Sequence, residues 1–315
     1  MNRHLIGGRY EVGKKIAAGS FGVIRLGKCT DNNEKVIIKL EHKNIKEPTL
    51  HLEYRFYKLI GDTNYAPKMF YFGHCSIYNA LIIELLGANL LECLELCAGK
   101  FSEKTVLQIA LKMLDAIEFL HSKRIIHRDL KPENWLLERK TCERSDNLRL
   151  SDFGLAKEYI DITTKQHIAF RSDKAIMGNA LYLSINAHKH LEQSRRDDLE
   201  AIGYILMHFL RSDLPWKITT FNVEDKYEQI GNEKEKTSLE KLCDGFAEEF
   251  VEYLHYVREL EFFEKPNYDM LREKFVNLFN EKYFGADREY DWQIEMRRID
   301  ERIQKNEKIE LSYRE

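Results

Sequence analysis

The sequence predicts an α+β protein with two lobes, a small antiparallel β lobe that carries one helix and a larger, mainly helical lobe. Three observations predict this arrangement. Apolar residues before Gly87 alternate as in half-buried strands, and after Gly87 they recur at helical spacing. The length of 315 residues, of which 43% are hydrophobic, also exceeds what one small domain needs for its core.

The N-terminal part contains short apolar, partly β-branched runs separated by turn residues. These runs predict strands over Tyr10–Ile16, Val23–Leu26, Val36–Leu40, Met69–Phe72 and Ala80–Leu85. One helix is expected among them, over Ile45–Ile60, because its apolar residues share one face and Gly61 follows as a stop signal. The glycine-containing run Leu85–Ala88 is the expected hinge between the lobes.

The C-terminal part has the longer periods of helices. Segments with an apolar stripe or an apolar interior predict helices over Thr105–Leu120, Asp198–Leu210, Ala247–Leu260 and Tyr268–Phe279. The second of these is so apolar that we expect it to be buried. Two short strands, Leu136–Leu137 and Leu148–Leu150, are expected to pair as a hairpin. Residues 151 to about 194 look irregular, and the charged end from about Arg297 predicts a frayed helix.

Composition excludes several functional classes. The formal net charge of −3 gives no indication of nucleic-acid binding. The six cysteines form no CxxC pair and no zinc spacing, so we expect reduced thiols in a soluble cytoplasmic or nuclear protein. No run approaches a membrane span, and the terminal S-Y-R-E is not a prenylation box, so no membrane partner is expected.

The stretch Ile126–Leu137, I-H-R-D-L-K-P-E-N-W-L-L, has the residue types of a phosphoryl-transfer loop. Pro132 prevents a helix from running through it. Asp129 can accept a proton, Lys131 can neutralise a phosphoryl oxygen, and Asn134 can hold a metal ion by its amide oxygen. The alternative is a solvated loop between a helix and a strand, so the interpretation depends on a nucleotide clamp elsewhere in the chain.

Candidate parts of that clamp lie upstream. The turn A-A-G-S-F-G at Ala17–Gly22 joins two expected strands, and such a loop can fold its N–H groups over phosphates. A plain hairpin turn explains the same residues. Lys39 lies within a buried β-run, where a lysine is costly to desolvate unless paired, and Glu53 on the following helix is the candidate partner. The alternative is a lysine that reaches solvent from an edge strand.

A second metal ligand is expected downstream. Ser151-Asp152-Phe153-Gly154 follows an apolar strand and places the Asp152 carboxylate where it can bind Mg²⁺, with Asn134 available for a second ion. An ordinary strand-to-loop turn would also account for this motif.

The order and spacing of these motifs resemble those of the eukaryotic protein kinases. Further motifs resemble the casein kinase one family, among them L-E-H-K at Leu40–Lys43, S-I-N-A-H at Ser184–His188 and E-Q-S-R-R-D-D-L-E at Glu192–Glu200. The resemblance covers about residues 8–295. It implies a single kinase domain over 1–315, with an N-lobe at about 8–87, a C-lobe at about 88–295 and a short charged tail at 296–315.

The resemblance implies a serine/threonine kinase that uses ATP and Mg²⁺ on protein substrates, and we expect a monomer. Asp129, Lys131 and Asn134 would be catalytic, and Asn134 and Asp152 would bind metal. The hinge would be Glu84–Leu86, after gatekeeper Ile83. The implied nucleotide-binding residues are Ile16, Ala17, Gly19, Ser20, Gly22, Ile24, Ile37, Lys39, Glu53, Ile83, Glu84, Leu86 and Leu136. The implied hydrophobic spine is Tyr57, His127 and Phe153, anchored through Asp198.

The chain departs from the family pattern at four places. Ala17 replaces the first glycine of the loop, and Ile37 replaces the alanine beside the adenine, which should crowd the base. Asn179 replaces a threonine that contacts the catalytic residues, and its amide could supply the same hydrogen bond. Leu181 replaces an arginine that helps to bind a substrate phosphate.

The fourth departure predicts a reduced preference for substrates that are already phosphorylated. Glu224 and Asp225 also lie in a segment that the family keeps basic, although Lys174 remains and Lys226 is a second candidate. One or two lysines bind a phosphate less well than a cluster that contains arginine. Thr163 and Thr164 could be autophosphorylation sites or simply solvated loop residues.

Two other functions were weighed against an active kinase. A pseudokinase scaffold with weak or no ATP turnover would explain Ala17, Ile37 and Asn179, but the groups that touch metal, phosphate and hydroxyl are all present. A small-molecule phosphotransferase of kinase-like fold lacks support, because Ser184–His188 and the run after it resemble the substrate platform of a protein kinase.

Overall fold

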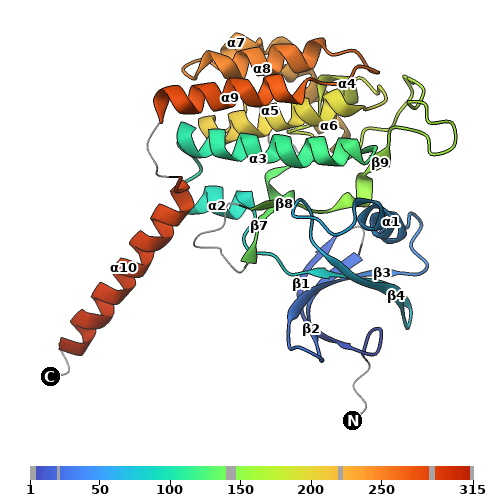
Figure 1. Cartoon of the computed structure of the whole chain (residues 1–315), viewed down its shortest axis with the longest axis vertical. Helices are drawn as coiled ribbons and strands as arrows, with labels where there is room; N and C mark the ends of the chain where they lie inside the picture. Colours follow the sequence, from blue (N-terminus) through green and yellow to red (C-terminus); the bar gives the residue numbers. More distant parts are fainter. Residues whose placement is uncertain (1–4, 20–21, 140–146, 219–222, 284–287, 313–315) are drawn as a thin grey trace.

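A computed structural model of the chain describes residues 5–19, 22–139, 147–218, 223–283 and 288–312. It has two lobes, a sheet with one helix and a stack of helices, with the short strands β7 and β8 near the junction between them (Figure 1). The predicted α+β class and the division into two lobes are therefore confirmed.

The N-lobe is a five-stranded sheet of order β1-β2-β3-β5-β4, in which every neighbouring pair is antiparallel. Each strand overlaps a predicted one, and they are β1 (Tyr10–Gly19), β2 (Gly22–Cys29), β3 (Lys35–His42), β4 (Met69–Cys75) and β5 (Tyr78–Glu84). Strand β1 continues through Ala17–Gly19, which was predicted as the start of a turn. The predicted helix is α1 (Leu50–Ile60), which begins five residues later than expected from Ile45. Pro48 explains why the helix does not begin at Ile45, because proline disfavours helical backbone in the residue before it.

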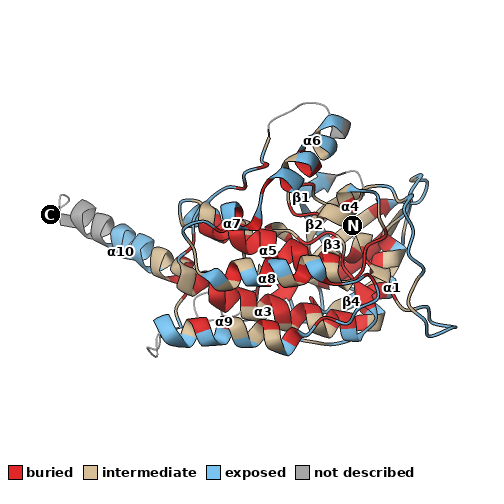
Figure 2. Ribbon diagram, turned by 90° about the horizontal axis from the view of Figure 1, so that it is seen from above, coloured by how far each residue is buried: buried red, intermediate tan, exposed pale blue. Residues whose placement is uncertain are grey.

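The C-lobe is built around one buried helix. Helix α5 (Arg195–Arg211) is buried along almost its whole length, as predicted from its apolar interior. Helices α3 (Glu103–Ser122) and α8 (Glu248–Glu259) pack against α5, and α9 (Tyr268–Lys282) packs against α3 and α8. The view in Figure 2 shows buried residues along the centre of this stack and exposed residues on its outer faces.

Several helices were not predicted from the sequence. They are α2 (Leu90–Leu96), α4 (Ile185–His188), α6 (Val223–Lys236) and α7 (Leu239–Leu242). Helix α6 is strongly charged and has few apolar positions, so its sequence shows no clear stripe. It is fixed by tertiary contacts instead, through the buried side chains of Ile230 and Lys234.

The C-terminal segment forms one long helix, α10 (Asp291–Ser312), which projects away from the C-lobe (Figure 1). We expected a frayed helix only from about Arg297. The helix begins earlier because Trp292 is buried against Phe101, with ring centroids 5.4 Å apart.

Short strands shape the loops between the lobes. Strands β7 (Trp135–Leu137) and β8 (Leu148–Leu150) form the predicted antiparallel hairpin, and β6 (Ile125–Ile126) pairs with β9 (Lys157–Glu158). The β6–β9 pair ties the segment that follows Asp152 to the chain that leads into the catalytic loop. Apart from β9, α4 and a 3-10 turn at Phe153–Leu155, residues 151–194 are irregular, as predicted.

The five cysteines in the described part of the chain are free thiols, and Cys142 lies outside it. In the same part of the chain, no helix is long and apolar enough to cross a membrane.

Candidate active site

Asp198 of the buried helix α5 fixes the catalytic loop through its backbone at His127 and Arg128. The Asp198 carboxylate accepts the backbone N–H groups of His127 (2.8 Å) and Arg128 (2.9 Å) and lies 3.0 Å from His121 Nε2. Burial alone would raise the pKa of Asp198, but the hydrogen bonds to its charged form outweigh burial and lower it. A carboxylate held in this way orients the loop immediately before Asp129.

Asp129 is fixed on both of its carboxylate oxygens. Oδ2 accepts a hydrogen bond from Lys131 Nζ (2.8 Å), and Oδ1 accepts one from the backbone N–H of Asn179 (2.9 Å). Asn134 Nδ2 donates to the Asp129 carbonyl (2.9 Å), which leaves the Asn134 amide oxygen for another partner. Gly178 permits the close approach, because a Cβ there would lie 2.5 Å from the Arg128 carbonyl oxygen.

Three charged residues meet on the opposite side of the site. Lys39 Nζ of β3 lies 2.6 Å from Glu53 Oε1 of α1 and 3.5 Å from Asp152 Oδ1. Burial would lower the pKa of Lys39, but the two carboxylates outweigh burial and raise it. The pKa of Asp152 is lowered, chiefly by Lys39, whereas burial raises the pKa of Glu53. The pairing predicted for Lys39 and Glu53 is therefore confirmed.

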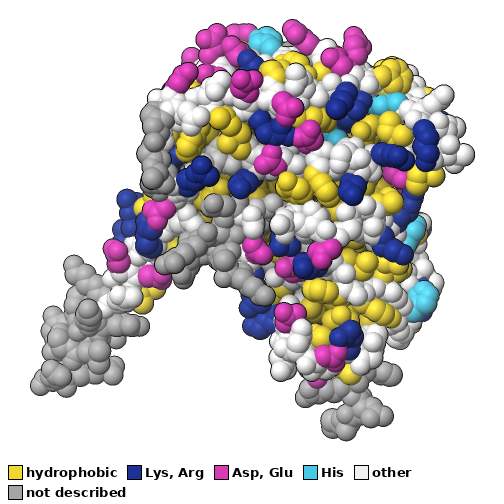
Figure 3. Space-filling view, viewed as in Figure 1, with side chains coloured by type: hydrophobic (Ala, Val, Ile, Leu, Met, Phe, Trp, Pro, Cys, Tyr) yellow, Lys and Arg dark blue, Asp and Glu magenta, His cyan; other side chains and the backbone are white. Residues whose placement is uncertain are grey.

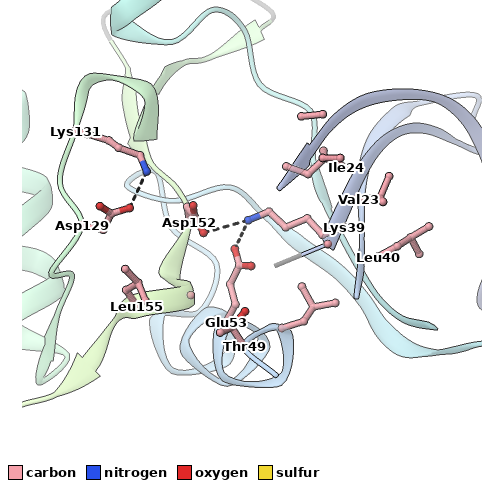
Figure 4. A pocket seen from close by; sticks show the side chains of 15 residues that line it. Val23, Ile24, Lys39, Leu40, Thr49, Glu53, Asp129, Lys131, Asp152 and Leu155 are labelled. Carbon is pink, nitrogen blue, oxygen red and sulfur yellow. Dashed lines mark hydrogen bonds and ion pairs between the residues drawn. The ribbon is translucent and has the colours of Figure 1, made fainter. Parts of the chain in front are cut away.

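A cavity of about 290 Å³ lies between these two groups of residues (Figure 4). Eight of the predicted site residues line it: Ala17, Gly22, Ile24, Lys39, Glu53, Asp129, Lys131 and Asp152. The close-up shows Lys131 and Asp129 on one side, the Lys39–Glu53 pair on the other, and Asp152 between them. The fold therefore brings together eight residues that the sequence assigned to one site, at the end expected to bind the phosphates.

Other predicted residues do not line this cavity. They are the predicted adenine-side residues Ile16, Ile37, Ile83, Glu84, Leu86 and Leu136, together with Gly19 and the metal-ligand candidate Asn134. Ile37 and Ile83 are cross-strand partners in β3 and β5, and both pack in the main hydrophobic core. The Glu84 carboxylate is bound by Arg149, at 2.9 Å. Ser20 lies outside the described residues.

The predicted spine is assembled in the structure. The Phe153 ring lies between Tyr57 and His127, with ring centroids 5.1 Å and 5.3 Å away and edge-on geometry in both pairs. His127 Nε2 also lies 3.1 Å from the Ser151 carbonyl oxygen. Aromatic contacts of this kind fix Asp152, the neighbour of Phe153, relative to α1 and the catalytic loop.

The structure adds lining residues that the sequence reasoning missed. They are Ala18, Val23, Leu40, Thr49, Leu50, Gly154 and Leu155. Helical spacing could have indicated Leu50, because it precedes Glu53 by three residues and so shares its face of α1. Val23 and Leu40 are cross-strand partners beside the glycine turn, which a predicted β2–β3 register would have shown.

The substrate side differs from expectation at Asn179. We expected its side-chain amide to replace a threonine hydroxyl beside the catalytic residues. Instead, Asn179 Oδ1 accepts the backbone N–H of Leu181 (3.0 Å), and only the Asn179 backbone N–H reaches Asp129. An asparagine side chain commonly closes such a local turn two residues ahead, and this local bond is satisfied here.

The predicted anion-binding lysine Lys174 is partly neutralised, and Lys157, which was not predicted, shares its partner. Lys157 and Lys174 both pair with the buried carboxylate of Glu192, at 2.8 Å and 3.4 Å. Asp225 is exposed, and the Glu224 side chain lies outside the described residues. Acidic and basic side chains are intermingled on the face shown in Figure 3, which agrees with the small net charge.

Comparisons with known proteins agree with this geometry. A family model described as a protein kinase domain matches residues 10–261. Casein kinase I homologs 1 and 2 of Schizosaccharomyces pombe are each 43% identical to the chain, over 292 and 291 residues. The chain belongs to the casein kinase I family of protein kinases. Both alignments cover 92% of this chain, and they cover about two thirds of each relative, 66% and 67%.

Membership of the casein kinase I family confirms the resemblance and places the chain in the class of ATP-dependent serine/threonine kinases. Protein kinases use a strand lysine, a helix glutamate, a catalytic-loop aspartate and a D-F-G aspartate together. Lys39, Glu53, Asp129 and Asp152 have these positions in the sequence and face one cavity in the structure.

Proposed function

We propose that the chain transfers the γ-phosphoryl group of Mg-ATP to serine and threonine hydroxyls of protein substrates. One observation carries the proposal. The Asp129 carboxylate, which Lys131 and the Asn179 N–H hold in place, faces the same cavity as Asp152 and the Lys39–Glu53 pair. A general base and a phosphate clamp on opposite sides of one cavity are what phosphoryl transfer requires.

The residues present fit a magnesium–nucleotide complex. Asp152 offers a carboxylate and Asn134 an amide oxygen, and both are hard oxygen ligands of the kind that Mg²⁺ prefers. Within the described residues, no group of three or more His, Cys, Asp or Glu could hold a metal. This agrees with Mg²⁺, which usually takes only one or two protein carboxylates and completes its shell with phosphates and water.

The roles of the protein groups follow from their positions. The bound metal would neutralise charge that develops on the phosphates. Lys39, held by Glu53, would bind phosphate oxygens in the cavity. Asp129 would accept a hydrogen bond from the substrate hydroxyl and receive its proton. Lys131, 2.8 Å from Asp129, would place positive charge where the phosphoryl group passes between donor and acceptor.

The catalytic role is tested by the variant Asp129→Asn, assayed on a serine/threonine peptide library. Loss of a general base typically costs 10²–10⁴-fold, so we expect kcat to fall by about 10³-fold with little change in the KM for ATP. Asp173→Asn is the matched control, because Asp173 is exposed in the irregular stretch of residues 151–194. Transfer that survives Asp129→Asn would refute the assignment of the base.

The substrate preference is proposed to differ from that of relatives that favour phosphorylated substrates. Leu181 stands in place of the expected arginine and packs against the core, and Lys174 is already paired with Glu192. We therefore expect matched phosphorylated and unphosphorylated peptides to differ in kcat/KM by less than about tenfold, or about 1.4 kcal/mol. A larger preference for the phosphorylated peptide would contradict this proposal.

A pseudokinase scaffold is the competing function, because the cavity does not extend to the predicted adenine residues, among them Ile37. A melting curve with and without Mg-ATP separates the two. A ligand that binds only the native state raises the midpoint, so we expect a clear increase at millimolar Mg-ATP. No shift and no phosphate transfer would favour the scaffold.

A further inference from the structure

A buried carboxylate with no assigned role lies on β3, two residues after Lys39. Glu41 is fully buried, and its Oε1 accepts the backbone N–H groups of Thr49 (2.7 Å) and Leu50 (2.9 Å). The Thr49 hydroxyl lies 3.4 Å from the same oxygen. Oε2 is also buried and has no hydrogen-bond partner within the described part of the chain.

These contacts make Glu41 the cap of helix α1. Thr49, at the cap position, makes no side-chain capping bond of its own, so the first N–H groups of the helix need another acceptor. The Glu41 carboxylate is that acceptor, and its negative charge is also favoured at the positive end of the helix dipole. The charge is thus stabilised only while the N-terminus of α1 stays against β3.

Glu41 and Lys39 act on the same helix from the same strand. Residues two apart on a strand share a face, so both side chains point toward α1. Lys39 binds Glu53 one turn into the helix, and Glu41 binds its first two N–H groups. If α1 moved outward, the Glu41 carboxylate would lose its donors while still buried in the lobe, which is unfavourable. The contact therefore favours the inward position.

The glycine-rich turn adjoins the same place. A Cβ on Gly22 would lie 2.2 Å from the Leu40 carbonyl oxygen and 3.4 Å from the Glu41 Cα, so the first residue of β2, at the end of this turn, lies directly against β3. Leu40, Thr49 and Leu50 all line the cavity. Glu41 therefore lies behind the wall at the phosphate end and connects three of its elements.

We propose that Glu41 is a positioning residue of the phosphoryl-transfer site. It acts through α1, which it holds where Glu53 reaches Lys39, and it touches neither nucleotide nor substrate. Kinase activity depends on the position of this helix, so α1 held inward by Glu41 and α1 moved outward would give different activity. The inference rests on the proposed kinase function for its effect on rate, and on the fold alone for its effect on α1.

The test compares Glu41→Leu, which removes the acceptor, with Glu41→Gln, which keeps it without the charge. Glu47→Ala is the matched control, because Glu47 is exposed in the loop just before α1. We expect Glu41→Leu to lower kcat/KM for ATP at least tenfold with an unchanged KM for peptide, and Glu41→Gln to lower it about threefold. Hydrogen exchange of the first-turn amides of α1 should be faster in both variants, with α3 unchanged.

A double-mutant cycle separates positioning from a general loss of stability. If Glu41 acts through Glu53, adding Glu41→Gln to Glu53→Gln causes no further loss of activity, whereas independent effects multiply. Multiplying losses, or wild-type exchange in α1 with wild-type kcat/KM, would overturn the proposal. If Glu41→Leu does not fold, the kcat/KM for ATP and the hydrogen exchange of α1 in Glu41→Gln test the proposal instead. Faster exchange in α1 of a protein that transfers no phosphate would refute the kinase function and leave the role in the helix intact.

Discussion

Asp129 is the proposed base, and its neighbours set the direction of its carboxylate. One carboxylate oxygen is bound by the Lys131 ammonium and the other by a backbone N–H from Asn179, a residue 50 positions away. Bonds to both oxygens leave little rotational freedom, so the remaining lone pairs point to a defined place in the cavity. The resemblance implied the role of the aspartate, but only the fold shows that Asn179 contributes its backbone and keeps its side chain for a turn.

A single residue is expected to limit nucleotide binding. Ile37 packs in the core beside Ile83, and overpacking at such a site costs about 1–3 kcal/mol. We expect Ile37→Ala to make room for the adenine and to lower the KM for ATP about three- to tenfold. Steady-state kinetics over a range of ATP concentrations measures it.

The control for that variant is Ile77→Ala, because Ile77 is exposed between β4 and β5 and should leave the KM for ATP unchanged. An Ile37→Ala protein that folds but binds ATP no more tightly would show that the isoleucine does not crowd the base.

Among the elements, α6 makes contacts with residues 178–183 that the sequence did not predict. Lys234 of α6 is fully buried and donates to the carbonyl oxygens of Ala180 (2.8 Å) and Leu183 (2.5 Å). Tyr227 of the same helix donates to the Gly178 carbonyl oxygen (2.7 Å). Helix α6 therefore holds the loop that carries the two departures at 179 and 181. A charged sequence with a weak apolar stripe gives no local signal for such a contact.

Helix α4 packs closely on α6 through His188. A Cβ on Gly231 would lie 3.0 Å from the His188 Cβ, so the glycine makes room for the histidine. His188 Nε2 lies 3.1 Å from the Ala180 carbonyl oxygen and 3.3 Å from the Lys234 ammonium, and the Tyr227 ring is 6.3 Å away. Burial first, and then the charge of Lys234, lowers the pKa of His188 to about 4.

This contact predicts a loss of stability in mild acid. Between pH 6.5 and about 4 the unfolded chain binds a proton at His188 and the folded chain does not, so lowering the pH favours unfolding. The effect is absent above the ordinary histidine pKa and amounts to about 1–3 kcal/mol once the pH has fallen to the folded-state pKa.

Urea unfolding of the wild type and of His188→Gln at pH 7, 6, 5 and 4.5 checks this prediction. Other buried histidines, such as His121 and His127, also have lowered pKa values and contribute to both curves. The variant should therefore lose less stability on acidification, with a slope smaller by up to about 1.4 kcal/mol per pH unit, the value for one proton. Parallel curves for the two proteins would contradict the role of His188.

At the scale of the molecule, the two lobes meet at a cavity whose walls come from distant parts of the sequence. Apolar spacing predicted the lobes, and motif order predicted which residues share the cavity and the spine, because each motif is local and its partners are fixed by the family pattern. The extent of the cavity was not predictable in this way. The extent depends on how β2, β3 and α1 pack together, because each contributes a lining side chain: Val23, Leu40 and Leu50.

The C-terminal helix α10 is anchored to the C-lobe at its start and exposed further along. Asp291 Oδ1 accepts the Ser102 hydroxyl (2.8 Å), and the Trp292 ring stacks on Tyr290 with centroids 4.3 Å apart. Further along, Ile299 is 38% exposed and Ile303 is 50% exposed. The first turn of α10 therefore belongs to the C-lobe core, and the rest projects away from the C-lobe (Figure 1).

Removing residues 300–315 should therefore affect neither stability nor catalysis. Residues 300–304, the part of the deletion whose burial is described, are all exposed, so we expect the midpoint of thermal unfolding to stay within about 2 °C, and kcat/KM within about twofold, of the full chain. Trp292→Ala, at the anchored end, should instead lower the free energy of unfolding by about 3–5 kcal/mol, because it empties a large buried site. Calorimetry, kinetics and light scattering on the three proteins check this. Activation by the deletion would reveal an inhibitory contact of the helix, and a dimer that dissociates on deletion would contradict the expected monomer.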